Sequence, residues 1–260
     1  MIDWHGAERP RRRIGRGVEA HATIGSTNDR ARALLGEAGG EGRAIVTEEQ
    51  TAGRGRRGRG WISPPGRNLM LSVAVRPRIA AADAWQLSIA SGLAARSACA
   101  VHAPAALKWP NDLVAGDGSK LGGLLIETTI DTDRVATAVI GIGINVNWPR
   151  AEMPAEIAAT ATSLADLAGN PIDRVQLLGT LLDELDAEVV AIEAGISPVV
   201  RYREVCSTLG TEVAIETATG RLRGSAIAVD DRGALVVETS AGPVAVSSGE
   251  VVRLRAGARA

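Results

Sequence analysis

Residues 135–146 are the segment that most restricts how this 260-residue chain can fold. The segment reads VATAVIGIGINV, is apolar at nearly every position, and is closed by Asn145 and Asn147. A continuous apolar run of this length, rich in β-branched residues, is typical of a strand that is buried on both faces. We therefore expect a buried strand at 135–146.

Other elements are predicted from alternation and helical spacing. Strands are expected at 43–48, 69–75 and 107–109, and helices at 30–35 and from Asp83, as its cap, to about Cys99. The clearest helix begins after Asp173, which can cap it, and Gly195 follows its end. Its apolar stripe steps by three and four through Val175, Leu178, Leu182, Leu185, Val189 and Ile192. A shorter helix is expected from Ser197 to about Thr208.

The pattern of residues along the chain changes after Gly210. Short alternating runs separated by tight turns follow at 212–217, 221–229, 234–239, 244–247 and 251–255. Five short strands with such turns predict a small barrel. The chain is thus divided into a flexible, arginine-rich N-terminus at 1–17, a main domain at 18–207 and a barrel at 208–260.

Composition places the chain among globular proteins, with 45% hydrophobic and 23% charged residues. The net charge of −1 excludes a generally basic nucleic-acid binder. No apolar run approaches the ~18 residues of a membrane span, and the N-terminus has no apolar secretory segment. Cys99 and Cys206 have no metal-binding spacing, and neither do the three histidines. We therefore expect a cytoplasmic protein with reduced cysteines, no membrane association and no zinc site.

The segment 48–61, EEQTAGRGRRGRGW, is the strongest candidate for a functional loop. Four arginines alternate with four glycines in it, between two expected strands. The forked guanidinium group suits phosphate and carboxylate, and glycine lets the backbone approach a ligand closely. We expect a loop that is mobile when empty and ordered around a polyanion. Arg-Gly repeats also occur as RNA-binding segments and as solvated linkers, so those alternatives stay open.

Five segments, taken together and in order, resemble the biotin protein ligases: GSTND at 25–29, EQTAGRGRRGRGW at 49–61, KWPND at 108–112, KLGGLLIE at 120–127 and GIGINVN at 141–147. The resemblance extends from about residue 20 to the C-terminus. It implies an α+β catalytic domain, a mixed β-sheet with helices, related to class II tRNA synthetases and lipoate ligases. It also implies a C-terminal SH3-like barrel, in agreement with the five strands expected after Gly210.

The resemblance further implies a two-step reaction with ATP and biotin as substrates and Mg²⁺ as cofactor. Biotin is first activated as biotinyl-5′-AMP and is then transferred to a lysine of a biotin carboxyl carrier protein. Some family members carry an N-terminal DNA-binding domain, for which this sequence leaves no room, so a ligase-only protein without DNA binding is expected. A homodimer is possible within the family.

Site residues follow from the same resemblance. Lys120 and Arg56 are the expected catalytic residues, and Asp112 is the expected Mg²⁺ ligand. The expected biotin contacts are Ser26, Thr27, Asn28, Gln50, Gly53, Arg54, Gly55, Arg56, Lys120 and Gly123. The expected ATP contacts are Arg54, Arg56, Trp61, Lys108, Asn111, Asp112, Lys120, Asn145 and Arg255.

Several alternatives accompany these assignments. Residues 26–28 could simply cap the helix that follows them. Lys108 competes with Lys120 for the catalytic role. Residues 160–164 contain no aromatic side chain, although some family members place a tryptophan near here against adenine, and Trp148 has no assigned position. A lipoate or octanoate ligase, an RNA-binding module and an inactive biotin sensor are the competing functions.

Overall fold

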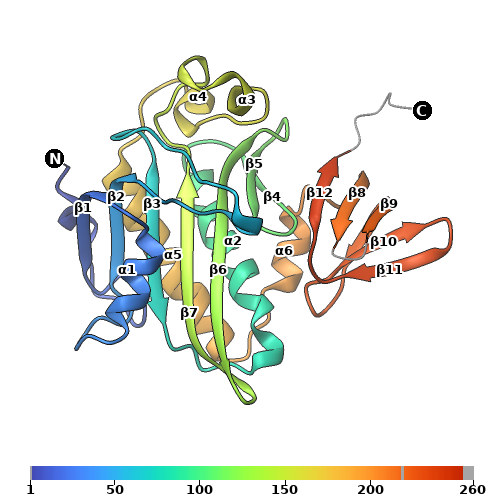
Figure 1. Ribbon diagram of the computed structural model, residues 1–260, viewed down its shortest axis with the longest axis horizontal. Helices are drawn as coiled ribbons and strands as arrows, with labels where there is room; N and C mark the ends of the chain where they lie inside the picture. The colour runs from blue at the N-terminus through green and yellow to red at the C-terminus, as the bar shows by residue number, and fades with distance from the viewer. Residues whose placement is uncertain (1, 218–219, 254–260) are drawn as a thin grey trace.

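Two β-sheets organise the chain in the computed structural model, which describes residues 2–217 and 220–253 (Figure 1). The larger sheet has seven strands in the order β1-β2-β3-β7-β6-β5-β4, and the smaller has five in the order β11-β10-β9-β8-β12. Helices pack on the larger sheet. The predicted α+β class, a mixed sheet with helices followed by a small β domain, is confirmed.

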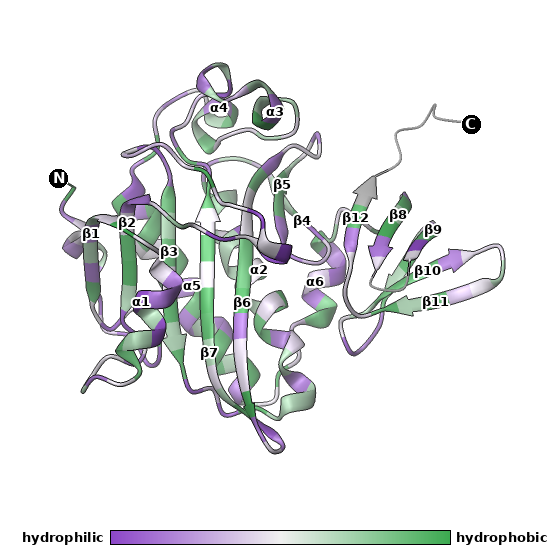
Figure 2. Cartoon of the chain, viewed as in Figure 1, coloured by the Kyte–Doolittle hydropathy of each residue, from purple (hydrophilic) through white to green (hydrophobic). Residues whose placement is uncertain are grey.

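The large sheet is parallel between β1 and β2 and antiparallel elsewhere. Its strands are β1 (Val18–Ile24), β2 (Ala44–Gln50), β3 (Leu69–Val75), β4 (Ala105–Lys108), β5 (Asp112–Ala115), β6 (Lys120–Asp131) and β7 (Arg134–Ile144). The buried strand predicted at 135–146 is β7, and it lies in the middle of the sheet between β3 and β6. Figure 2 shows hydrophobic residues along both β3 and β7.

Helices cover both faces of this sheet because its central strands are apolar on both sides. On one face, α2 (Trp85–Ala100) and α5 (Arg174–Glu193) enclose the main core with the alternate β3 residues Leu69, Leu71 and Val73. On the other face, α1 (Thr27–Leu34) packs on Ala74 of β3 and Val139 of β7. The remaining helical segments are η1 (Trp4–Ala7), η2 (Arg56–Gly58), η3 (Ala81–Asp83), η4 (Arg150–Glu152), α3 (Ala155–Ala158), α4 (Leu164–Ala168) and α6 (Val199–Val205).

The predicted caps of α5 and α2 have different outcomes. Asp173 caps α5 as expected, since its carboxylate accepts hydrogen bonds from the backbone N–H groups of Val175 and Gln176. The predicted cap by Asp83 is wrong, because this residue lies within η3 and α2 begins after Ala84 without a side-chain cap. Within 2–217 and 220–253, no helix is both long and apolar enough to span a bilayer.

The smaller sheet contains the five strands expected after Gly210. They are β8 (Glu212–Thr217), β9 (Gly220–Val229), β10 (Leu235–Thr239), β11 (Gly242–Val246) and β12 (Glu250–Arg253). Strands β11 and β12 lie at its two edges, so closure into a barrel stays a prediction, as does the boundary at 208. The indole N–H of Trp109 donates to the carbonyl of Gly233 at 3.1 Å and so ties the two sheets together.

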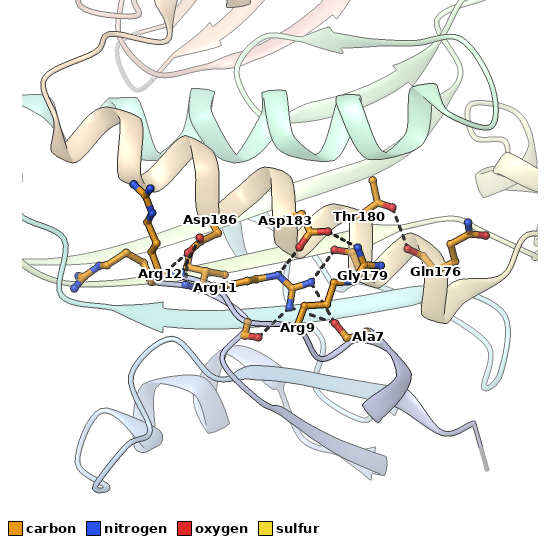
Figure 3. Close-up of polar contacts among 12 residues, drawn as sticks. Ala7, Arg9, Arg11, Arg12, Gln176, Gly179, Thr180, Asp183 and Asp186 are labelled. Carbon is orange, nitrogen blue, oxygen red and sulfur yellow. Dashed lines mark hydrogen bonds and ion pairs between the residues drawn. The ribbon is translucent and has the colours of Figure 1, made fainter.

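Residues 2–17 pack on the domain, while the predicted flexibility of the N-terminus at 1–17 stays a prediction. Trp4, Ala7 and Ile14 are buried. Figure 3 shows the arginines of this segment meeting two acidic residues of α5. The Asp183 carboxylate accepts from Arg9 at 2.7 Å and from Arg11 at 2.8 Å.

Asp186, one helical turn further along α5, receives the backbone of the same segment. Its carboxylate accepts from the N–H groups of Arg12, Arg13 and Ile14 at 3.0, 2.6 and 2.7 Å. A basic segment looks like a solvated tail in sequence, because the acidic residues that bind it lie about 170 positions away.

Candidate ligand-binding site

A cavity opens on the α1 face of the large sheet, beside the smaller sheet. Its empty space is about 1090 Å³ when the solvent in its open mouth is included. Most of the residues selected from the sequence line it: Ser26, Thr27, Asn28, Gln50, Arg54, Gly55, Arg56, Trp61, Lys108, Asn111, Asp112, Lys120 and Gly123. Segments far apart in the chain therefore meet at one place.

The floor of the cavity is made by glycines. Gly141 and Gly143 are two apart on β7, so both face the cavity side of the sheet. A Cβ atom on Gly143 would lie 2.6 Å from the Trp61 ring, and one on Gly141 would lie 2.3 Å from Asn28 Oδ1. Only glycine at these positions allows the indole and the amide to rest directly on the strand.

One end of the cavity is lined by neutral polar groups. Gln50 Oε1 accepts from the backbone N–H of Thr27 at 2.8 Å and lies 3.1 Å from its hydroxyl. The Ser72 hydroxyl lies 2.7 Å from Thr27 Oγ1 and 2.6 Å from Asn28 Oδ1. Such a set can recognise a small polar, uncharged group.

The residues before α1 serve this wall rather than the helix. Ser26 occupies the N-cap position of α1, but its side chain makes no capping hydrogen bond. Instead Ser26 is buried and lines the cavity together with Thr27 and Asn28. The side-chain capping interpretation of these residues is therefore wrong for Ser26.

The opposite end of the cavity carries cations. Lys120 begins β6, and its ammonium group donates to Asp112 Oδ1 at 2.6 Å. The same ammonium lies 6.0 Å from the centre of the Trp61 ring. Lys108 also lines this end, beside Asn111 and Asp112.

The arginine loop lines the cavity and contacts the smaller sheet. In Figure 1 it runs across β7 and β6 toward that sheet. Arg56 donates to Asn111 Oδ1 at 3.1 Å. Arg57 donates to the carbonyl of Glu216 at 2.7 Å, and Arg59 pairs with Glu250 at 2.7 Å. The structure thus shows the loop in a closed arrangement, while its predicted mobility when empty stays a prediction.

Two arginines of the loop have contrasting electrostatics. Arg54 forms a two-pronged pair with Asp29, and these hydrogen bonds raise the pKa of Arg54 and lower the pKa of Asp29. Burial, followed by the nearby charge of Arg57, lowers the pKa of Arg56. A guanidinium with the ordinary pKa above 12 still stays charged, so Arg56 is a partly desolvated cation facing the cavity. An anionic ligand would offset the free-energy cost of that desolvation.

Two of the predicted residues do not line the cavity. Asn145 is buried, and its amide donates to the carbonyl of Thr162 at 3.1 Å instead of lining the cavity. Gly53 packs against the backbone at the other end of its own loop, where a Cβ would lie 2.8 Å from the Trp61 carbonyl. Arg255 lies outside the described residues. Trp148 is buried with Met153 and Ala161, away from the cavity lining.

Several residues at or beside the site have no role predicted from the sequence. Ser72 is the one polar residue in the apolar strand 69–75, and a lone polar residue in a buried strand indicates a possible site residue. Gly141 and Gly143 are two residues apart in a predicted strand, so the sequence predicts that they share one face of it. Glu127 accepts a hydrogen bond from Asn28 at 2.6 Å. No local sequence pattern predicts this contact, because the two residues are far apart in the chain.

Comparisons with known proteins agree with this geometry. A family model described as "Biotin/lipoate A/B protein ligase family" matches residues 22–145, and one described as "Biotin protein ligase C terminal domain" matches 208–254. A biotin–[acetyl-CoA-carboxylase] ligase of Mycobacterium tuberculosis is 38% identical over 250 residues, covering 92% of this chain and 90% of that protein. The bifunctional ligase/repressor BirA of Bacillus subtilis is 32% identical over 92% of this chain and 74% of its own length.

Solved structures give the same result. The biotin protein ligase of Aquifex aeolicus in complex with biotin and ATP has a TM-score of 0.79 and 28% identity, covering 92% of this chain and 99% of that one. The Leishmania major enzyme in complex with biotinyl-5-AMP has a TM-score of 0.61 and 26% identity, covering 89% and 99%. The chain belongs to the biotin protein ligase family.

Proposed function

We propose that this protein activates biotin with ATP and transfers the biotinyl group to a lysine amine of a biotin carboxyl carrier protein. One observation carries the proposal: a single cavity joins a neutral polar end, at Gln50 and Ser72, to a cationic end, at Lys120 and Arg56. Biotin has the matching polarity, with a neutral ureido ring at one end and a carboxylate at the other.

In the first step, the biotin carboxylate attacks the α-phosphorus of ATP, the P–O bond to the β-phosphate breaks, and pyrophosphate leaves. Negative charge accumulates on the phosphoryl oxygens, so fixed cations beside them lower the barrier. Lys120, held by Asp112, can bring the carboxylate and the α-phosphate together. Arg56 supplies a second cation from the loop.

The residues near Lys120 also fit a Mg²⁺ ion that arrives with the nucleotide. Asp112 and Asn111 both place side-chain oxygens in the cavity wall. In the part of the chain that the structure describes, no three His, Cys, Asp or Glu residues gather in a group that could hold a metal. Mg²⁺ typically needs only one or two carboxylates when phosphates complete its shell, so Asp112 suffices as its protein carboxylate. When bound, the ion neutralises phosphate charge.

In the second step, the carrier lysine amine attacks the acyl carbon of biotinyl-5′-AMP, an amide forms, and AMP leaves. The mixed anhydride must be kept from water until the carrier arrives. The closed arginine loop, anchored on Glu216 and Glu250 of the smaller sheet, can provide that cover. We place this activity in the cytoplasm, where ATP and thiol-reducing conditions occur together.

The test is biotin-dependent exchange of radiolabel between pyrophosphate and ATP. We expect exchange with biotin and none with lipoate or octanoate. Exchange with lipoate or octanoate but not with biotin would assign a lipoate-type ligase instead. Binding of biotin without exchange would indicate a sensor. Tight, salt-sensitive binding of single-stranded RNA without exchange would favour the RNA-binding alternative.

A further inference from the structure

Glu127 lies behind the polar end of the cavity and does not line it. It is on β6 opposite Val139 of β7, and it faces the side of the sheet that α1 covers. Its Oε2 atom accepts from Asn28 Nδ2 at 2.6 Å and lies 2.9 Å from Arg32 NH2. Asn28 itself is buried and lines the cavity. Glu127 can therefore act on a ligand through its contact with Asn28.

A carboxylate determines which way the Asn28 amide points. An ionised carboxylate only accepts hydrogen bonds, whereas an amide has a donating and an accepting side. Asn28 must therefore turn its NH₂ toward Glu127 and its carbonyl oxygen toward Ser72. Without Glu127, both amide orientations would be open to Asn28.

The orientation of Asn28 in turn determines what Ser72 can offer. A serine hydroxyl has one hydrogen and two lone pairs. With Asn28 Oδ1 at 2.6 Å, that hydrogen goes to Asn28. The Ser72 oxygen, 2.7 Å from the Thr27 hydroxyl oxygen, is then left to accept from a ligand N–H. The polar end of the cavity becomes an acceptor.

We propose that Glu127 is a positioning residue that fixes the hydrogen-bond direction through Asn28 and Ser72, so that Ser72 accepts from a ureido N–H of biotin. This inference rests on the proposed function and names the residue that tunes its ligand recognition. If Asn28 were free to flip, the Ser72 hydrogen could point into the cavity and meet the ureido N–H head-on, with two donors facing each other.

The experiment compares Glu127→Gln with the wild-type enzyme in biotin-dependent pyrophosphate–ATP exchange. Glutamine keeps the shape but can donate or accept, so it no longer selects one Asn28 orientation. We expect the KM for biotin to rise about tenfold, the size of one misdirected hydrogen bond, with kcat and the KM for ATP within about twofold. A biotin derivative methylated at the ureido nitrogens should bind the two enzymes equally weakly.

Arg32→Ala is the matched control, because it removes the ion pair with Glu127 and leaves the contact with Asn28 in place. It should behave as wild type. The Ser72→Ala background supplies a double-mutant cycle. If Glu127 acts through Ser72, adding Glu127→Gln to Ser72→Ala should change the KM for biotin by less than about twofold.

An unchanged KM in Glu127→Gln, or an equal loss with and without Ser72, would overturn the role of Glu127. Equal weakening of biotin and of its methylated derivative would overturn it as well, since that pattern indicates general damage. Absence of biotin-dependent exchange in the wild-type enzyme would instead overturn the proposed function, and the inference with it. The melting temperature of each variant shows whether it is folded.

Discussion

Single atoms set the depth of the cavity. The missing Cβ atoms of Gly141 and Gly143 leave room for Asn28 and Trp61 to lie on the sheet. Lys120 is held by Asp112, and Arg56 is held by Asn111 and by the carbonyl of Gly249. At this scale the site depends on a few close approaches, so small substitutions have large effects.

Gly141→Ala tests the close approach. The new Cβ would lie 2.3 Å from Asn28 Oδ1, so the amide must move and lose its contacts with Ser72 and Glu127. We expect a stability loss of about 1–3 kcal/mol and at least tenfold weaker biotin binding. Calorimetry measures both. Gly116→Ala is the control, because a Cβ there meets no atom within 4 Å.

Lys120→Ala should nearly abolish adenylate formation. Removal of one fixed cation or donor that stabilises transition-state charge costs about 10²–10³ in kcat. Biotin-dependent pyrophosphate–ATP exchange measures the loss. Lys108→Ala is assayed beside it, since both lysines line the same end of the cavity. Unchanged exchange in Lys120→Ala would move the catalytic role to Lys108.

Arg56→Ala should let biotinyl-5′-AMP escape. Arg56 joins the loop to Asn111 and is the partly desolvated cation beside the expected phosphate. Without carrier protein, we expect free adenylate to accumulate in solution faster than with the wild-type enzyme. The free adenylate is measured by chromatography after the enzyme has been removed by filtration. A variant that retains its adenylate normally would contradict a closing role for the loop.

Elements are held in place by charged side chains as well as by the core. The N-terminal segment uses backbone N–H groups and arginines against Asp183 and Asp186, on one face of α5. The arginine loop uses Arg57 and Arg59 in the same way against the smaller sheet. In both cases charged and polar partners far away in the chain help to place the segment.

Asp186→Ala tests the N-terminal attachment. The change removes the acceptor of three backbone N–H groups, and the one of Ile14 is buried. An unsatisfied buried donor costs about 1–3 kcal/mol, so we expect a stability loss of at least that size. Chemical denaturation gives the value, and limited proteolysis should show cleavage near residue 12. Glu184→Ala, on the same helix, is the control and should have little effect.

At the scale of the whole molecule, the core between the large sheet and its two covering helices excludes water. Cys99 of α2 lies fully inside it, and burial raises the pKa of its thiol to about 12. The folded pKa is thus above the ordinary value of 9.0. Burial of the neutral thiol stabilises the fold fully below pH 9, and this contribution is lost as the pH rises from 9 through about 12.

Cys99→Ala tests this alkaline dependence. Between pH 9 and 10.5 the free energy of unfolding of the wild-type protein should fall by about 2 kcal/mol more than that of the variant. Other titrating groups, such as Tyr202, are common to both proteins and cancel in the comparison. Denaturant titrations across this pH range give the two curves. Curves that stay parallel would show that Cys99 ionises without cost in the fold.

Local patterns predicted most of the elements well. The buried strand 135–146, the long helix after Asp173 and the five strands after Gly210 all depend on periodicity and on turn or cap residues, which are local properties. The motifs likewise selected thirteen of the cavity-lining residues. The contact of Glu127 with Asn28, the packing of the N-terminal segment and the hydrogen bond of Asn145 to Thr162 could not be predicted in this way. Each depends on which residue a side chain meets across the fold.

The sequence by itself determined the order of strands and helices, the family and most of the residue types in the site, because these depend on spacing along the chain. The tertiary structure alone decided which charges meet. Asp183 and Asp186 bind the N-terminal segment, Glu250 pairs with Arg59, and Glu127 accepts a hydrogen bond from Asn28. Hydrogen bonds and ion pairs act over about 3 Å, and only the folded chain brings residues that are distant in sequence within that range.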